Sequence, residues 1–238
     1  MLIATPVFSA TASTSPKNAI KASGAGYFDE LTSTPSYKFI IPNQKGPQSW
    51  SCTYMDNTVR ASSQGTTISI DKSFSSSRPY TCGEMISRTD AQYGTYTVDM
   101  IPTDTRGHVT GFFIISSNGG STEIDIELTG INSNVVHLNV WKNGVQHPVK
   151  IPLGFDAAKD WHTYSFEWRE DFIAWSIDGK EVYRQSAVKT VDPRFTPCKL
   201  VLNSWTNNHD DGWAGKFSWP TGRSSRVESR FRKLKYTP

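Results

Sequence analysis

A run of alternating acidic and apolar residues, Glu123 to Glu127 (EIDIE), constrains the fold of this chain most strongly. A period of two is typical of a half-buried β-strand, so both isoleucines are expected in a core and Glu123, Asp125 and Glu127 on the opposite face. Three like charges on one face repel one another and lower stability. We therefore interpret the three carboxylates as functional residues.

Their spacing suits acid–base chemistry at a glycosidic bond. The Cα atoms of Glu123 and Glu127 lie about 13 Å apart along an extended strand. If the side chains lean inward on a bent strand, the carboxyl groups can reach the ~5–5.5 Å spacing of a retaining glycosidase. Asp125 lies between them and is expected to raise the proton affinity of a neighbouring glutamate. A solvated acidic strand edge and a calcium cluster are the alternative interpretations.

Composition restricts the possible partners. At 238 residues the chain is long enough for one large β domain, and its eight Trp suit both sugar stacking and core packing. The formal net charge of +3 and the absence of a dense Lys/Arg run argue against a nucleic-acid partner. No apolar stretch reaches the ~18–20 residues of a membrane span. We expect a soluble monomer without a cofactor or a membrane partner.

The three cysteines are Cys52, Cys82 and Cys198. Cys52 and Cys82 are the better candidates for a disulfide because both occur in polar, strand-like segments flanked by Trp or Tyr. Closing that loop would contribute roughly 3–4 kcal/mol and would place the protein in an oxidising, extracellular compartment. Three buried thiols in a cytosolic protein are the alternative.

The N-terminal segment is set apart from the fold. Residues 1–13 are similar to the end of a secretory signal, with Ala10-Thr11-Ala12 as a cleavage-like site, but a basic segment before it is missing. We interpret residues 1–23 as a signal-like or disordered arm and residues 24–238 as a single domain.

Short runs rich in Val, Ile, Thr, Tyr and Phe recur between clusters of Gly, Pro, Asn, Asp and Ser, which predicts a protein made of β-strands. Asp178-Gly179 and Lys142-Asn143-Gly144 are turn signals, the former typical of a two-residue hairpin. No helical period extends beyond two turns, so an antiparallel β-sandwich of jelly-roll type fits best. The predicted strands are 67–70, 94–100, 109–116, 122–128, 135–141, 161–168, 172–177, 181–183, 199–204 and 225–236.

Further polar and aromatic residues are expected beside the carboxylates. His137, Asn139 and Trp141 alternate on the next predicted strand, so a hairpin with the acidic strand would place them on the carboxylate face. A lone His in a strand is usually a surface residue, and a lone Trp is usually core. Together with Asn203, Trp205 and Trp213, however, these residues predict a sugar-binding cleft.

In this order and spacing the motifs resemble glycoside hydrolase family 16, most closely its lichenase branch, the bacterial β-1,3-1,4-glucanases. The resemblance extends from about Gly26 to Tyr236. Besides the acidic motif, which has the unbulged spacing of lichenases and wall transglycosylases, it rests on Cys52 and Cys82, Tyr93-Gly-Thr-Tyr96, Gly154-Phe-Asp-Ala157, Trp161-His-Thr-Tyr164, Trp175-Ser-Ile-Asp-Gly179, Asn203-Ser-Trp205 and Trp213-Ala-Gly215.

The resemblance implies a concanavalin A-like jelly roll with a concave substrate cleft. It further implies that Glu123 is the nucleophile, Glu127 the acid/base and Asp125 the assisting carboxylate. The positions that match glucan-contacting residues of the family are Glu84, Asn139, Trp141, Asn203, Trp205 and Trp213.

Three positions depart from the lichenase pattern. Ser121-Thr122 replaces a Trp-Asp pair that forms one subsite wall. Ile86 replaces an arginine, and Arg88 is a candidate substitute from the same strand face. Ser229 replaces an aspartate that helps to hold a structural calcium, so no metal site is predicted.

The sequence thus favours an endo-acting, retaining hydrolase of β-glucan (a β-1,3-1,4- or β-1,3/1,4-glucanase). A cell-wall glycan transglycosylase is the first alternative, because a sugar hydroxyl can replace water at the same site. A non-catalytic lectin on the same fold is the second, although a lectin has no use for three crowded carboxylates.

Overall fold

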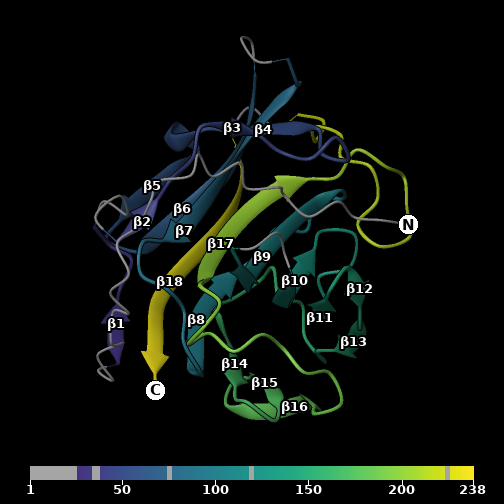
Figure 1. Ribbon diagram of the computed structural model, residues 1–238. Helices are drawn as coiled ribbons and strands as arrows, with labels where there is room; N and C mark the ends of the chain where they lie inside the picture. Colours follow the sequence, from purple (N-terminus) through teal and green to yellow (C-terminus); the bar gives the residue numbers. More distant parts are fainter. Residues whose placement is uncertain (1–25, 34–37, 74–76, 118–120, 223–225) are drawn as a thin grey trace.

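The structure, a computed structural model, describes residues 26–33, 38–73, 77–117, 121–222 and 226–238 (Figure 1). The predicted N-terminal arm, residues 1–23, lies outside these ranges. The strands are β1 (Tyr27–Asp29), β2 (Phe39–Ile40), β3 (Gln44–Lys45), β4 (Cys52–Tyr54), β5 (Val59–Ser62), β6 (Gly65–Lys72), β7 (Tyr80–Ser87), β8 (Gly94–Ile101), β9 (His108–Ser116), β10 (Thr122–Thr129), β11 (Val135–Lys142), β12 (Val145–Gln146), β13 (Val149–Pro152), β14 (His162–Trp168), β15 (Ile173–Ile177), β16 (Lys180–Gln185), β17 (Cys198–Thr206) and β18 (Val227–Thr237).

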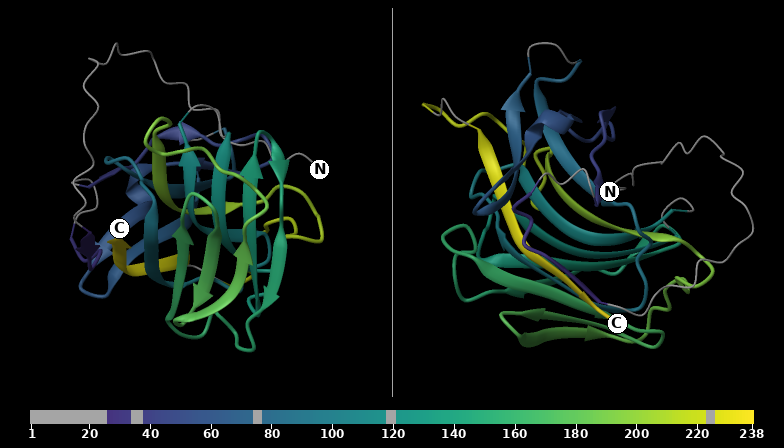
Figure 2. Two further views of the ribbon diagram at one scale, coloured as in Figure 1. Left: turned by 60° about the horizontal axis from the view of Figure 1, so that its bottom comes forward. Right: turned by 90° about the vertical axis from the view of Figure 1, so that its left-hand side faces the viewer.

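These strands form two layers that face each other. In the first layer, β2, β7, β17, β9, β10, β11 and β13 pair in that order. In the second, β5, β6, β18, β8, β14, β15 and β16 pair in that order. The pairs are antiparallel, except that β4 runs parallel to β7. The predicted all-β jelly roll is therefore confirmed, and the right-hand view of Figure 2 shows strands of the first layer bent into an arc.

The alternation of the acidic strand places its apolar residues between the two layers. Ile124 and Ile126 are fully buried in the same core cluster as Phe166, Trp168 and Trp175 of the second layer. The Trp175 indole Nε1 also donates a hydrogen bond to the backbone carbonyl of Asp125, at 3.1 Å. The core therefore fixes both the register and the position of the strand that carries the carboxylates.

Two predicted turns adopt the conformation that their sequences favour. Asp178 and Gly179 have φ values of 49° and 78°, and Asn143 and Gly144 have the same pair of values. A two-residue loop with positive φ at both positions matches the right-handed twist of a hairpin. These turns join β15 to β16 and β11 to β12.

A disulfide joins Cys52 of β4 to Cys82 of β7, with a Cα–Cα distance of 5.7 Å, which confirms the predicted pairing. Cys198 is a buried free thiol. Among the described residues, β4 and β7 are the only parallel strand pair, and the bond lies within it. It therefore ties β4, and the segment that leads from Trp50 into β4, to the first layer.

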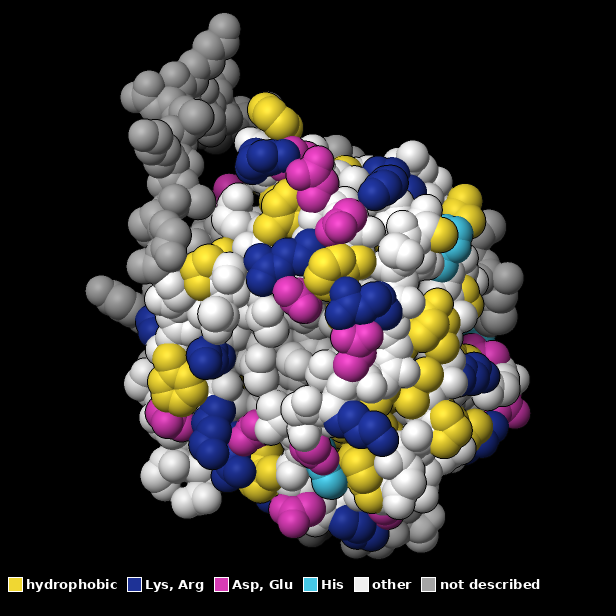
Figure 3. Space-filling view, turned by 90° about the horizontal axis from the view of Figure 1, so that it is seen from below, with side chains coloured by type: hydrophobic (Ala, Val, Ile, Leu, Met, Phe, Trp, Pro, Cys, Tyr) yellow, Lys and Arg dark blue, Asp and Glu magenta, His cyan; other side chains and the backbone are white. Residues whose placement is uncertain are grey.

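The outward side of the second layer is polar. It carries ion pairs such as Arg232–Asp99 and Arg184–Glu181, and Figure 3 shows basic and acidic side chains interspersed on the face seen from below. Across the described ranges, no helix is long and apolar enough to span a membrane.

Candidate active site

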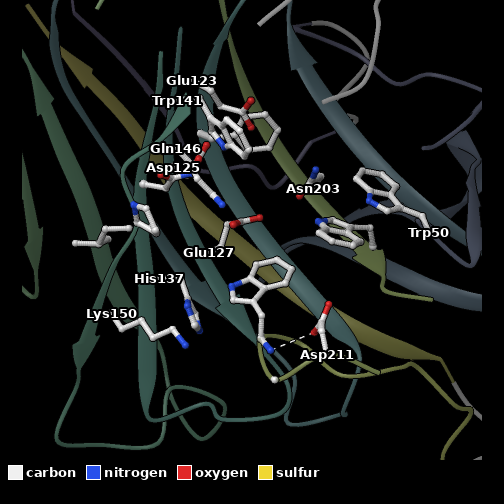
Figure 4. A pocket seen from close by; sticks show the side chains of 17 residues that line it. Trp50, Glu123, Asp125, Glu127, His137, Trp141, Gln146, Lys150, Asn203 and Asp211 are labelled. Carbon is white, nitrogen blue, oxygen red and sulfur yellow. Dashed lines mark hydrogen bonds between the residues drawn. The ribbon is translucent and has the colours of Figure 1, made fainter. Parts of the chain in front are cut away.

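The concave side of the first layer holds a cavity of about 360 Å³ (Figure 4). Nine of the residues selected from the sequence line it: Glu123, Asp125, Glu127, His137, Asn139, Trp141, Asn203, Trp205 and Trp213. They come from β10, β11, β17 and the loop after β17. Segments up to 90 residues apart in the sequence therefore contribute to one cavity.

Strand register explains why these side chains meet. Across the β10–β11 pair, Glu123 lies opposite Trp141, Asp125 opposite Asn139 and Glu127 opposite His137. Cross-strand partners share a face of the sheet, so the three acids and their three partners all point into the cavity. This is the register that the alternation of the two segments predicts.

Burial dominates the electrostatics of the carboxylates. It raises the pKa of Glu123 to about 7 and that of Glu127 to about 8, and in each case a neighbouring carboxylate adds to the effect. The pKa of Asp125 rises well above its usual range, because burial is reinforced by the charges of both glutamates. Since loss of all three protons would place three charges in a poorly solvated site, the group retains protons near neutral pH.

Hydrogen bonds favour one arrangement of these protons. Asp125 and Glu123 share a hydrogen bond that lowers the pKa of Glu123, which fits a protonated Asp125 donating to an ionised Glu123. Asn139 also hydrogen-bonds Asp125, and its Oδ1 accepts the backbone N–H of His147 at 2.9 Å, which directs the amide nitrogen toward Asp125. Glu127 has the higher pKa of the two glutamates, so it is the one that more often carries a proton near neutral pH and is available to act as the acid.

Glu84 lies beside this group but below the surface of the cavity. It is 2% exposed, and burial raises its pKa to about 7, although hydrogen bonds with Tyr54 and Asn203 lower it in part. Its charge contributes to the raised pKa of Glu123. The neighbouring Ile86 packs in an apolar cluster with Phe113 and does not supply a cation.

Arg88 does not take the place of the missing arginine. It follows the last residue of β7, is exposed, and is not among the residues that line the cavity. Its carbonyl oxygen accepts a hydrogen bond from the Lys199 Nζ at 2.8 Å. The prediction that Arg88 contacts substrate in this cavity is therefore not supported.

A row of aromatic rings forms one side of the cavity. Trp50 stacks on Trp205 with ring centroids 4.4 Å apart and an interplanar angle of 13°. Trp213 lies 5.8 Å from Trp205, and His137 meets Trp213 edge-on at 5.8 Å. Such rings offer flat apolar faces on which sugar rings can stack.

The loop that carries Trp213 is held by Asp211. One carboxylate oxygen of Asp211 accepts the backbone N–H groups of Trp213, Ala214 and Gly215, at 2.9–3.1 Å. Figure 4 shows Asp211 at the rim of the cavity with one of these bonds. Three hydrogen bonds to one charged acceptor fix the loop and hence the ring.

His137 does not supply a positive charge near neutral pH. Burial lowers its pKa to about 4, and the charge of Lys150 on the adjacent strand β13 adds to this shift. A neutral imidazole can orient a hydroxyl group of the substrate, but it cannot stabilise an anion as a cation does.

Several lining residues escaped the sequence-based prediction. Trp50 precedes Cys52 and was recognised only as its neighbour, whereas Gln146, Pro148 and Lys150 belong to short segments around β12 and β13 without a strand signal. Trp50 could have been found from the aromatic-rich context of Cys52. The other three offered no such signal.

Ser229 does not fit the calcium site that the family resemblance implies. The side chain is fully buried, and its hydroxyl lies 2.6 Å from the Thr110 hydroxyl and 3.2 Å from that of Ser204. The carboxylate that an aspartate would offer to calcium is absent at this position, and the Ser229 hydroxyl is occupied by its neighbours. Within the described ranges, no group of three or more His, Cys, Asp or Glu side chains is placed to hold a metal ion.

Comparison with known proteins agrees with the geometry. The sequence profile of Glycosyl hydrolases family 16 matches residues 46–221. A β-glucanase of Acetivibrio thermocellus is 35% identical over 193 residues, which cover 79% of this chain and 55% of the relative. A β-glucanase of Paenibacillus polymyxa is 33% identical over 175 residues, which cover 72% of this chain and 71% of the relative. The chain thus spans about half the length of the Acetivibrio relative.

Solved structures show the same fold. A prokaryotic β-1,3-1,4-glucanase (lichenase) derived from a mouse hindgut metagenome superposes with a TM-score of 0.81 at 29% identity, covering 90% of this chain and 99% of the other. The Bacillus licheniformis β-glucanase gives a TM-score of 0.79 at 27% identity, with 91% and 99% covered.

Proposed function

This chain belongs to glycosyl hydrolases family 16, and from that premise we propose that it is an endo-acting, retaining β-glucan hydrolase. One observation carries the proposal: a single strand presents three neighbouring carboxylates, Asp125 buried and Glu123 and Glu127 half-buried, to a cavity flanked by stacked Trp rings. A retaining glycosidase needs an ionised nucleophile and a protonated acid within a few ångströms of the scissile bond. Glu123 and Glu127 fit these two roles.

In the first step, the Glu123 carboxylate attacks the anomeric carbon while Glu127 donates its proton to the departing glycosidic oxygen. The bond from the anomeric carbon to that oxygen breaks, and a covalent glycosyl–enzyme ester forms. Asp125 supports this step because its hydrogen bond lowers the pKa of Glu123 and so keeps more of the nucleophile in the ionised form that can attack.

In the second step, Glu127, now ionised, takes a proton from water. The water oxygen bonds to the anomeric carbon, and the ester bond breaks to return Glu123 as a carboxylate. Two displacements restore the original anomeric configuration. The high pKa of Glu127 suits both of its roles, as acid and then as base.

The substrate class follows from the relatives and from the cavity. The relatives from Acetivibrio thermocellus and Paenibacillus polymyxa are β-glucanases, and one neighbouring structure is a lichenase, so a β-glucan with 1,3 and 1,4 linkages is the proposed substrate. The Cys52–Cys82 disulfide supports an extracellular location, where such polymers occur.

A side-by-side assay of lichenan, cereal mixed-linkage glucan, laminarin, xyloglucan and chitin oligomers tests this proposal. We expect turnover of the mixed-linkage glucans, with viscosity falling faster than reducing ends appear, as for cleavage within chains. The Glu123→Gln variant should lose turnover and still bind glucan. A wild-type protein that binds glucan but cleaves none of these polymers would be a lectin.

The same assay with added oligosaccharide acceptors examines the transglycosylase alternative. If a sugar hydroxyl competes with water for the glycosyl–enzyme, products longer than the donor fragment appear early. We expect hydrolysis products to dominate, and early dominance of longer products would assign the site to transfer.

A further inference from the structure

Gly111 occupies the centre of the cleft floor. It lies in the middle of β9, opposite Glu127 of β10 on one side and opposite Asn203 of β17 on the other. Cross-strand partners share a face, so a side chain at this position would project into the cleft between Glu127 and Asn203. Glycine places no side chain there.

The volume that a side chain would fill at this position is taken by Asn203. A Cβ atom on Gly111 would lie 2.5 Å from the Asn203 Oδ1, a separation that real Cβ atoms essentially never show. Its next contacts, at 3.4 Å, are with the Asn203 Cγ and a ring atom of Phe113. The Asn203 Oδ1 therefore lies above the Gly111 backbone, on the face of the sheet that also carries Glu127.

This oxygen has no hydrogen-bond partner. Asn203 is 3% exposed, and its Nδ2 donates to the Tyr54 hydroxyl at 3.3 Å, whereas its Oδ1 is buried and unpaired. A buried acceptor without a donor is costly, so such atoms are usually satisfied by water or ligand. A hydroxyl group of a sugar bound over the floor is a suitable donor.

Backbone conformation does not explain the glycine. Gly111 has no positive φ, in contrast to eight other glycines of the described chain. A glycine inside a strand normally weakens the strand because it gains backbone freedom on unfolding and packs no side chain. The close approach of the Asn203 amide is the feature of the structure that requires it.

We propose that Gly111 is a positioning residue, which leaves room for the Asn203 amide over the strand so that Asn203 Oδ1 can accept a hydrogen bond from a glucan hydroxyl beside Glu127. The inference rests on the proposed function and deepens it, because it assigns a role in substrate recognition to a residue without a side chain. Gly111 acts through Asn203 and does not itself need to contact the sugar.

A double-mutant cycle on the full chain tests the inference. Steady-state kinetics on lichenan are measured for the wild type, Gly111→Ala, Asn203→Ala and the double variant, together with the Tm of each. We expect Gly111→Ala to lower kcat/KM about tenfold, the effect of losing one hydrogen bond to bound substrate. In the Asn203→Ala background, the same change should lower kcat/KM by less than twofold.

The Tm separates positioning from folding. Because the strand backbone accepts alanine and the clash is with the end of a side chain rather than with backbone, Gly111→Ala should unfold within about 2 °C of the wild type. Equal losses in both backgrounds, or an unchanged kcat/KM in Gly111→Ala, would overturn the inference. An inactive wild type would instead contradict the proposed function, so the two failures are distinguishable.

Discussion

Burial distinguishes the three carboxylates of β10 from the ordinary acids on this protein's surface. Asp192 and Glu181 pair with arginines in solvent, and their pKa values are lowered. Glu123, Asp125 and Glu127 have each other as neighbours, and their pKa values are raised. The pKa values move in opposite directions because the surroundings differ. The surface acids lie beside a cation in water, whereas the β10 acids lie beside other carboxyl groups in a poorly solvated floor.

These shifts predict the pH dependence of activity. The reaction needs an ionised Glu123 and a protonated Glu127, so kcat/KM should rise as the group that includes Glu123 loses a proton and fall as Glu127 does. With pKa values of about 7 and about 8, the optimum should lie near pH 7–8 rather than near pH 5. A pH–rate profile on lichenan measures this, and an optimum below pH 5 would contradict it.

Glu84→Gln should move the acid limb of that profile. Because the charge of Glu84 raises the pKa of Glu123, its removal should lower that pKa and shift the limb to lower pH. Glu228→Gln, on β18 in the opposite layer, serves as the control, because it makes the same replacement of a carboxyl group by an amide far from Glu123 and should leave the limb in place. An unshifted limb in Glu84→Gln would show that the two carboxyl groups are not coupled.

For single residues, the period of two predicts correctly which side chains share a face when they lie on one long strand. The period of two placed Glu123, Asp125 and Glu127 together, and the same argument placed Asn139 and Trp141 beside them. It could not place Lys150 or Gln146, whose strands are too short to show a period. Arg88 was selected on strand parity alone, and it follows the point where β7 ends.

The strand β10 combines a fully buried apolar face with a strained acidic one. Between the ordinary value near 4.5 and the raised value of about 7, the folded chain keeps a proton on Glu123 that the unfolded chain has lost. Stability attributable to this group is therefore full below about pH 4.5 and decreases as the pH rises toward 7. The acidic face thus lowers the free energy of unfolding at the pH where the enzyme is expected to work.

Glu123→Gln should consequently stabilise the protein, and more so at high pH. We expect a gain of about 2 kcal/mol at pH 8, or roughly 4–8 °C in Tm, and little change at pH 4.5. Thermal unfolding followed by circular dichroism at both pH values measures the difference. A larger gain at pH 4.5 than at pH 8 would have the wrong sign for a raised pKa.

The disulfide is predicted to stabilise the junction of β4 and β7. Its cysteines are separated by 30 residues, so closing the loop contributes about 3–4 kcal/mol in the chain-entropy description. Replacing Cys52 and Cys82 by Ala should lower the Tm by roughly 6–16 °C. Reducing agent should lower the Tm of the wild type but not that of the double variant, which serves as the control.

The strand β7 was not predicted from the sequence. Its residues, YTCGEMIS, show neither a period of two nor a continuous apolar run. The predicted ranges of β10, β14 and β18 agree with the structure to within two residues at each end. The short β1, β2 and β3 have two or three residues each, too few for any periodic signal.

For the whole molecule, the fold class followed from composition and turns, whereas the pairing of distant strands did not. The order β7–β17–β9–β10 brings Glu84, Asn203, Gly111 and Glu127 into one row, although the first two are 119 residues apart in the sequence. Local pattern carries no information on such pairings, and only the resemblance to a known family suggested that Glu84 and Asn203 share a site. The stacking of Trp50 on Trp205 also joins residues far apart in the sequence, so local pattern does not predict it either.

The stereochemistry of the first product tests the central claim most directly, because it reports whether two carboxylates of one strand act by double displacement. Proton NMR of lichenan digestion can observe the anomeric signal of the newly formed reducing end before mutarotation. The account predicts that the β-anomer appears first, with the α-anomer growing in later. Initial release of the α-anomer would mean a single displacement by water, and Glu123 would then not be a nucleophile.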